Sequence, residues 1–148
     1  MAIDYFFDLT IEKSPQEFLQ HTAQCFSLNW IDRSLTGSAL LISAGNINSL
    51  ALTISQEDLG ISPTVSVLFN FNMSEYTEET YRLMIRICAH WLASEPGDAV
   101  LVESTAGYLF LRKSGILTID TDIVAGWWKP ERLDLMPEPW QRGNLPAY

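Results

Sequence analysis

The chain has few of the residues from which metal and catalytic sites are built. Its 148 residues include two histidines, His21 and His90, and two cysteines, Cys25 and Cys88. A protein zinc site needs three or four ligands at set spacings, and neither a C-x-x-C nor an H-E-x-x-H motif is present. Each histidine falls on the flank of a predicted helix. We therefore predict structural or surface histidines, no bound metal ion and no cofactor.

The familiar catalytic motifs are missing too. The chain contains no G-x-S-x-G, no P-loop and no G-x-G-x-x-G, the spacings that hold an activated serine or a phosphate group at a strand-to-helix turn. Ser104 and Ser114 lie in predicted turns, and no activating base stands near either of them in the sequence. We therefore predict that the protein is not an enzyme.

Long apolar runs and an N-terminal leader are also absent. The opening MAIDYFFDL carries Asp4 and Asp8 and no leading basic residue, unlike a secretory signal peptide. No run approaches the ~18–20 apolar residues of a membrane span. We expect a cytoplasmic protein without a membrane partner, in which both cysteines are free thiols buried on apolar helix faces.

Basic residues are scarce. Nine Lys and Arg stand against 18 Asp and Glu, which leaves a net charge of −9. Nucleic acid is disfavoured as a partner, because phosphate contacts need clustered Lys and Arg. A basic protein partner is favoured, because opposite fields speed encounter. Equally, the acidity could serve only to keep the protein in solution.

The most informative stretch is residues 63–92. Over residues 64–72 the apolar side chains alternate, the period of a half-buried strand. The apolar spacing then changes to three and four, which predicts a helix capped by Ser74 or Thr77 and stopped by Pro96-Gly97. The side chains predicted to be buried where this strand meets this helix are Val67, Phe69, Leu83, Ile87 and Trp91.

The remaining segments predict a mixed fold. A helix capped by Ser14 should run to about residue 28, and residues 29–36 are ambiguous. Further strands are predicted at residues 2–9, 39–44, 50–54, 99–103, 108–112 and 116–120, with a hairpin turn at 45–48. We predict an α+β fold with a mainly antiparallel sheet and two helices packed on it, in the order β-α-β-β-β-α-β-β-β with an extended C-terminal tail. Residues 1–148 should form a single domain, and the proline-containing tail, residues 127–148, should pack on its surface.

Two acidic clusters and one tryptophan pair are candidates for partner contact. They comprise Glu57, Asp58, Glu75, Glu78, Glu79, Trp127 and Trp128. The glutamates follow i, i+3, i+4 spacing on the polar side of the central helix, so they form either a patch for a basic partner or an ordinary solvated face. Adjacent residues of an extended chain face opposite sides. One of the two tryptophans should therefore be exposed as an interface anchor, unless the tail covers it.

Several segments together resemble a known family. In chain order they are MAIDYFFDL, LGISPTVSVLFNF, EPGDAVLV, LFLRKSGILTID and LDLMPEPW. This order is similar to that of the immunity proteins of swarming-inhibition toxin systems, in particular the third immunity type. The resemblance implies a single immunity-type domain in the cytoplasm, which binds and neutralises a cognate toxin delivered by sister cells. It supplies no active-site residues.

A secretion chaperone for an effector protein is the alternative. Such chaperones resemble this chain in size, acidity and mixed α+β composition, and they usually dimerise. For an immunity protein we expect a monomer bound to a basic toxin, so the oligomeric state distinguishes the two functions.

Overall fold

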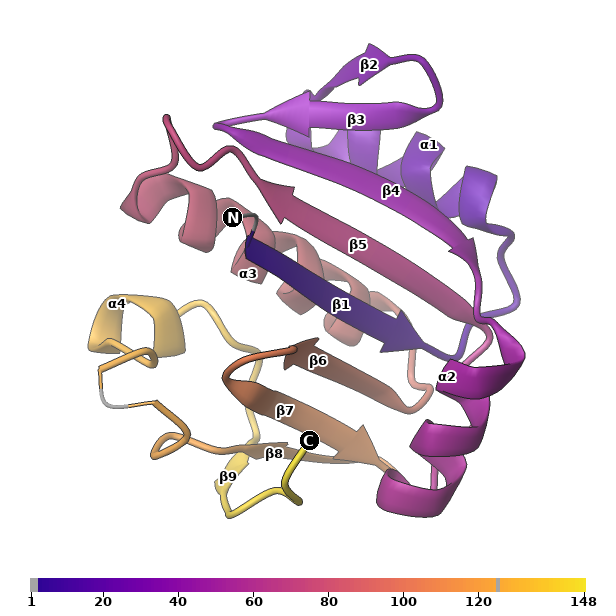
Figure 1. Cartoon of the computed structure of the whole chain (residues 1–148), viewed down its shortest axis with the longest axis vertical. Coiled ribbons are helices and arrows are strands. Elements are labelled where there is room, and N and C mark those ends of the chain that lie inside the picture. The colour runs from indigo at the N-terminus through magenta and orange to yellow at the C-terminus, as the bar shows by residue number, and fades with distance from the viewer. Residues whose placement is uncertain (1–2, 125) are drawn as a thin grey trace.

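The computed structural model describes residues 3–124 and 126–148, and its organising element is one sheet of nine strands (Figure 1). In chain order the elements are β1 (Ile3–Leu9), α1 (Pro15–Phe26), β2 (Asn29–Ile31), β3 (Ser34–Gly37), β4 (Leu40–Asn46), α2 (Ser49–Ile54), the π-helical turn η1 (Ser55–Leu59), β5 (Val65–Phe71), α3 (Glu78–Ser94), β6 (Ala99–Glu103), β7 (Gly107–Lys113), β8 (Ile116–Ile119), α4 (Pro130–Leu133) and β9 (Gln141–Arg142).

The sheet is mainly antiparallel. Its strand order is β2-β3-β4-β5-β1-β6-β7-β8-β9, and the β8–β9 pair is parallel. The predicted α+β class is therefore confirmed. The predicted element count is wrong, because the described residues form nine strands and four α-helices where seven strands and two helices were expected. Residue 2, the first residue of a predicted strand, lies outside the described residues.

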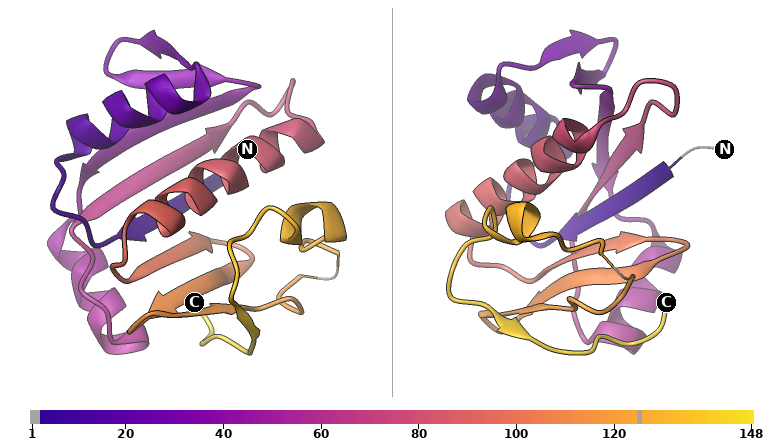
Figure 2. Two further views of the ribbon diagram at one scale, coloured as in Figure 1. Left: turned by 180° about the vertical axis from the view of Figure 1, so that it is seen from behind. Right: turned by 90° about the vertical axis from the view of Figure 1, so that its left-hand side faces the viewer.

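Helices α1 and α3 form a layer on one face of the sheet (Figure 2). α1 begins with a capping box: the Ser14 side chain accepts a hydrogen bond from the Glu17 amide, and the Glu17 carboxylate accepts one from the Ser14 amide. Thr77 caps α3, and α3 ends at Ser94, just before Pro96. Both starts follow the predicted signals, because each cap satisfies amide groups that have no partner within the helix.

The main core lies between this helix layer and the sheet. Val67, Phe69, Leu83, Ile87 and Trp91 are each at most 8% exposed, so the predicted core is confirmed. The ring of Phe18 in α1 stacks on Trp91 in α3 at 4.5 Å between centroids. The Trp91 indole also donates a 3.0 Å hydrogen bond to Thr22 Oγ. These contacts set the position of the two helices relative to each other.

Residues 49–54 form helix α2, and the strand predicted at 50–54 is wrong. The side-chain oxygen of Asn48 accepts a 2.8 Å hydrogen bond from the Ala51 amide and starts the helix. β4 instead continues to Asn46, so the hairpin turn predicted at 45–48 does not form. An apolar run of five residues is too short to reveal its period, and here the asparagine cap selects the helix. The segment around Glu57 forms η1, which ends at Gly60 in a left-handed conformation.

The C-terminal segment is more structured than an extended tail. It contains α4, which packs beside α3, and β9, which extends the sheet at the β8 edge. In the described part of the chain, no helix combines the length and the apolar character that a bilayer crossing requires.

Candidate partner-binding surfaces

One face of the sheet is left partly uncovered. α1 and α3 cover one side of β4, β5 and β1, whereas on the other side α2 stands only at the end of these strands (Figures 1 and 2). On this second side the three strands present a set of polar and apolar side chains, which we call the open sheet face: Asp4, Phe6, Asp8, Leu41, Ser66, Leu68 and Asn70.

The open sheet face has polar pairs on both sides of an apolar pair. The strand register places Phe6 opposite Leu68. On one side of this pair, Asn70 donates a 2.6 Å hydrogen bond to the Asp4 carboxylate. On the other side, Ser66 donates a 2.5 Å hydrogen bond to Asp8. Cross-strand neighbours of this kind interact directly, so the face presents an apolar centre with a carboxylate on each side.

Asp8 is the buried acidic group of this face. It is 7% exposed, and burial raises the pKa of its carboxyl, while the Ser66 hydrogen bond acts in the opposite direction. Asp8 lines a hollow with Phe6, Ser66 and Tyr108. A buried acid in a hollow with a perturbed pKa is a candidate functional group.

Two of the predicted acidic residues lie at opposite ends of the open sheet face. Glu75 lines a second hollow together with Leu41, Asn70 and Met73, at the end nearest the start of α3. Asp58 in η1 lies near Tyr108; burial first, and the Asp58 charge second, raise the pKa of Tyr108 to about 12. Glu57 is exposed beside Asp58 on the same turn.

The other two predicted acidic residues have partners within the protein. Glu78 accepts hydrogen bonds from Arg132 at 2.8 Å and from Lys129 at 3.2 Å. The Arg132 hydrogen bond is the main cause that lowers the pKa of Glu78 to about 2. Glu79 forms a 2.7 Å ion pair with Arg86. Their charges are thus partly compensated, whereas no ion pair engages Glu75 among the described residues.

The expectation that Trp127 or Trp128 is exposed is wrong. Their exposed fractions are 8% and 6%. The Trp127 indole donates to the Tyr5 hydroxyl at 2.9 Å, and that of Trp128 donates to the Leu109 carbonyl at 3.2 Å. The pair lies in a turn rather than a strand, so the alternation that would separate them does not apply. Their burial removes the reason for counting them as partner contacts.

Sequence reasoning missed a different exposed tryptophan. Trp30 and Ile31 lie on β2 at one edge of the sheet, 44% and 53% exposed. The short hairpin β2–β3 occupies the segment that the sequence left ambiguous. Its only signal is the pair of apolar residues before the Asp32-Arg33 turn, which is too short for a period to be read.

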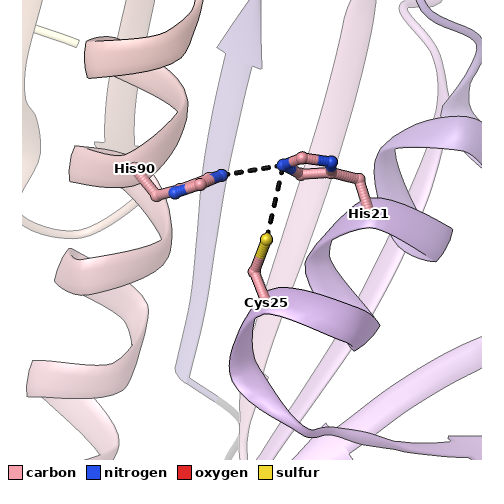
Figure 3. Close-up of side chains that lie close together, drawn as sticks. All are labelled: His21, Cys25 and His90. Carbon is pink, nitrogen blue, oxygen red and sulfur yellow. Dashed lines mark hydrogen bonds between the residues drawn. The ribbon is translucent and has the colours of Figure 1, made fainter.

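Sequence reasoning also separated three residues that the fold brings together. His21, Cys25 and His90 converge between α1 and α3 (Figure 3). The prediction that both cysteines are buried is wrong for Cys25, which is exposed, and correct for Cys88. The i, i+4 spacing of His21 and Cys25 on one helix was the available signal, but His90 is distant in the sequence.

A family model described as SitI3-like matches residues 3–132. The chain belongs to the SitI3-like family. The resemblance to swarming-inhibition toxin immunity proteins is thereby confirmed. No curated protein and no solved structure gives a significant match to the chain. Membership in the SitI3-like family suggests an immunity protein that has a toxin as its partner and a role other than catalysis.

The SitI3-like match begins with β1 and ends at Arg132 within α4. It therefore includes all seven residues of the open sheet face, both acidic clusters and the buried tryptophan pair. β9 and the residues after it lie beyond the match.

Proposed function

We propose that this chain neutralises a cognate toxin by direct protein–protein contact, and that the open sheet face is the contact surface. Membership in the SitI3-like family is the observation that carries the toxin partner. The chemistry of the face supports the choice of surface.

The composition of the face is suited to a protein partner. Interfaces of inhibitory complexes bury ~800 Å² on each side and depend on a few apolar anchors surrounded by polar groups. Phe6 and Leu68 provide a partly exposed apolar centre, and Leu41, 38% exposed, extends it across β4. Asp4 and Asp8 lie beside this centre, with Glu75 and Asp58 beyond them. The surface therefore matches a partner with an apolar centre and surrounding basic groups.

The effect of Asp8 on the stability of the fold also supports the proposal. Because burial raises its pKa, the ionised carboxylate at neutral pH costs the fold free energy. An asparagine could accept the same hydrogen bond from Ser66 without that cost. A destabilising acid is explained if its charge is used in binding, where a basic partner group would compensate it.

The acidic clusters divide into two groups under this proposal. Asp58 and Glu75 contact the toxin with carboxylates that no ion pair engages among the described residues, and Glu57 adds charge beside them. Glu78 and Glu79 contribute less, because their partners Arg132 and Arg86 already offset them.

The test is protection of a cell that expresses the cognate toxin. Asp58→Lys combined with Glu75→Lys should leave the melting temperature nearly unchanged and abolish protection. Glu131→Lys with Glu138→Lys, two exposed acids of the C-terminal segment, is the matched control with the same change in charge, and should protect fully. Full protection by the first pair would refute toxin contact at the two ends of the open sheet face. Loss of protection in both pairs would assign the effect to net charge alone.

A further inference from the structure

Two histidines and a cysteine meet on the helix side of the molecule, away from the open sheet face (Figures 2 and 3). His21 and Cys25 come from α1, and His90 comes from α3. The Nε2 atoms of His21 and His90 are 2.8 Å apart, and Cys25 Sγ is 3.5 Å from His21 Nε2. The three ligand atoms all lie within 4.8 Å of one another, and among the described residues they form a group able to hold a metal ion.

The packing between α1 and α3 holds the three side chains close together. His21 and Cys25 are one helical turn apart, so their side chains lie on the same side of α1. His90 precedes Trp91, which stacks on Phe18 and donates its hydrogen bond to Thr22, the residue after His21. Phe26 also packs edge-on against the His90 ring at 5.7 Å. The two helices are thus held together at the point where the ligand atoms converge.

Hydrogen bonding does not account well for the contacts at His21. Its Nε2 atom faces both His90 Nε2 and Cys25 Sγ, but an imidazole nitrogen offers either one proton or one lone pair. It can therefore form a hydrogen bond with one of these two neighbours but not with both.

A metal ion at the point between the three atoms would engage all of them. We propose that His21 Nε2, Cys25 Sγ and His90 Nε2 bind a Zn²⁺ ion. The thiol releases its proton to solvent on binding, and both imidazoles bind as neutral ligands. A thiolate and two imidazoles suit Zn²⁺ and exclude the oxygen-seeking ions Mg²⁺ and Ca²⁺.

The observed distances fit this ion after a small adjustment. Zn–N bonds of about 2.0–2.1 Å and a Zn–S bond of about 2.3 Å at tetrahedral angles separate two nitrogens by about 3.3 Å, and nitrogen from sulfur by about 3.6 Å. The distance of 3.5 Å between Cys25 Sγ and His21 Nε2 already agrees, and the two imidazoles must move apart by about half an ångström. Cys25 Sγ and His90 Nε2, which lie within 4.8 Å of each other, must also settle at about 3.6 Å. Cys25 is exposed, so water can complete the coordination as the fourth ligand.

The consequence of binding is a cross-link between α1 and α3. Because the site lies on the opposite side of the sheet from the open face, the proposal does not rest on the proposed function. Metal-bound protein should be more stable, since an ion that binds the folded state alone raises its stability by mass action. At a hundredfold excess over Kd, the melting temperature should rise by about 5–10 °C for a chain of this size.

The test uses the purified full chain, stripped with a chelator. Calorimetric titration with Zn²⁺ should give one ion per chain, and titration with Co²⁺ should produce a thiolate-to-metal charge-transfer band in the near ultraviolet together with the visible bands of a tetrahedral site. Cys25→Ser should remove the charge-transfer band and weaken binding by at least about 100-fold, because even a lost second-shell partner costs about 10–100-fold. His90→Gln should weaken binding similarly.

Two variants serve as matched controls. Cys88→Ala removes the other thiol, which is fully buried, and should keep both the band and the affinity. Gln24→Ala changes the exposed residue beside Cys25 and should also bind normally. Because Cys25 is exposed, its serine variant should fold, which its melting curve without metal verifies. Failure of the wild-type chain to bind Zn²⁺ at micromolar concentration, or equal binding by Cys25→Ser, would overturn the proposal.

Discussion

Arg132 joins the C-terminal segment to the rest of the fold, and its removal should be among the most damaging single changes. Its side chain is 5% exposed and donates two hydrogen bonds to the Glu78 carboxylate and one, at 2.7 Å, to the Trp127 carbonyl. The guanidinium also lies 3.9 Å from the centre of the Tyr81 ring. The residue thus connects α4 to the start of α3 and to the buried tryptophan turn.

The expected loss for Arg132→Ala is about 2–5 kcal/mol, summed over the three kinds of contact that its side chain makes. The Trp127 carbonyl, left without its donor, accounts for about 1–3 kcal/mol of this, and the lost contact with the Tyr81 ring for about 0.5–2 kcal/mol. The Glu78 pair contributes the remainder, which is modest because the Glu78 side chain is 38% exposed. Urea denaturation of the variant and the wild type measures the difference.

Lys129→Ala is the matched control, since Lys129 also pairs with Glu78 but is 51% exposed. It should cost at most about 1 kcal/mol.

Because the pKa of Glu78 is lowered to about 2, its ion pair stabilises the fold fully above the ordinary value of 4.5 and is lost as the pH falls through about 2. The gap between wild type and Arg132→Ala should therefore narrow over that range. A loss below about 1 kcal/mol for Arg132→Ala at neutral pH would refute this account.

Three further predictions concern the core, the buried acid and the partner. Phe69→Ala should lower the free energy of unfolding by about 3–5 kcal/mol through lost burial and a cavity; an unchanged urea midpoint would contradict the packing of this fully buried ring. Asp8→Asn should raise the melting temperature at neutral pH, and the difference should vanish below the ordinary carboxyl pKa of 3.8, because a raised pKa makes the ionised form unfavourable in the folded state. Association with the toxin should slow as salt rises, given the net charge of −9; on-rates that agree within about twofold at low and high salt would exclude steering.

Long periodic segments were predicted well from the sequence. β5 and α3 each present enough repeats for the change from a period of two to one of three or four to be visible, and their buried faces follow directly. The helix starts at Ser14 and Thr77 were also readable, because caps depend on a few adjacent residues. Short elements such as α2 and β2 were not predicted, since packing and a single cap decide them.

The candidate sites were harder to predict because they depend on the sheet order. Asp4 and Asp8 lie on β1, which pairs with β5, a strand about sixty residues later in the chain. Their hydrogen-bond partners Asn70 and Ser66 lie on β5. No local sequence pattern predicts that the two strands are neighbours. The compensation of Glu78 by Arg132 is likewise a long-range contact. The tryptophan pair misled because the prediction assumed an extended backbone, whereas the turn at Gly126 lets both rings enter the core.

The contrast between the two cysteines gives this protein a built-in attachment point. Cys88 is fully buried in α3, and Cys25 is exposed on α1. In the folded, metal-free chain a maleimide dye or a biotin linker should therefore react at Cys25 and leave Cys88 unmodified. Because α1 lies behind the sheet in Figure 1, a chain immobilised through Cys25 would present the opposite side of the molecule to the solution. The toxin could then be captured on a sensor surface in a single known orientation.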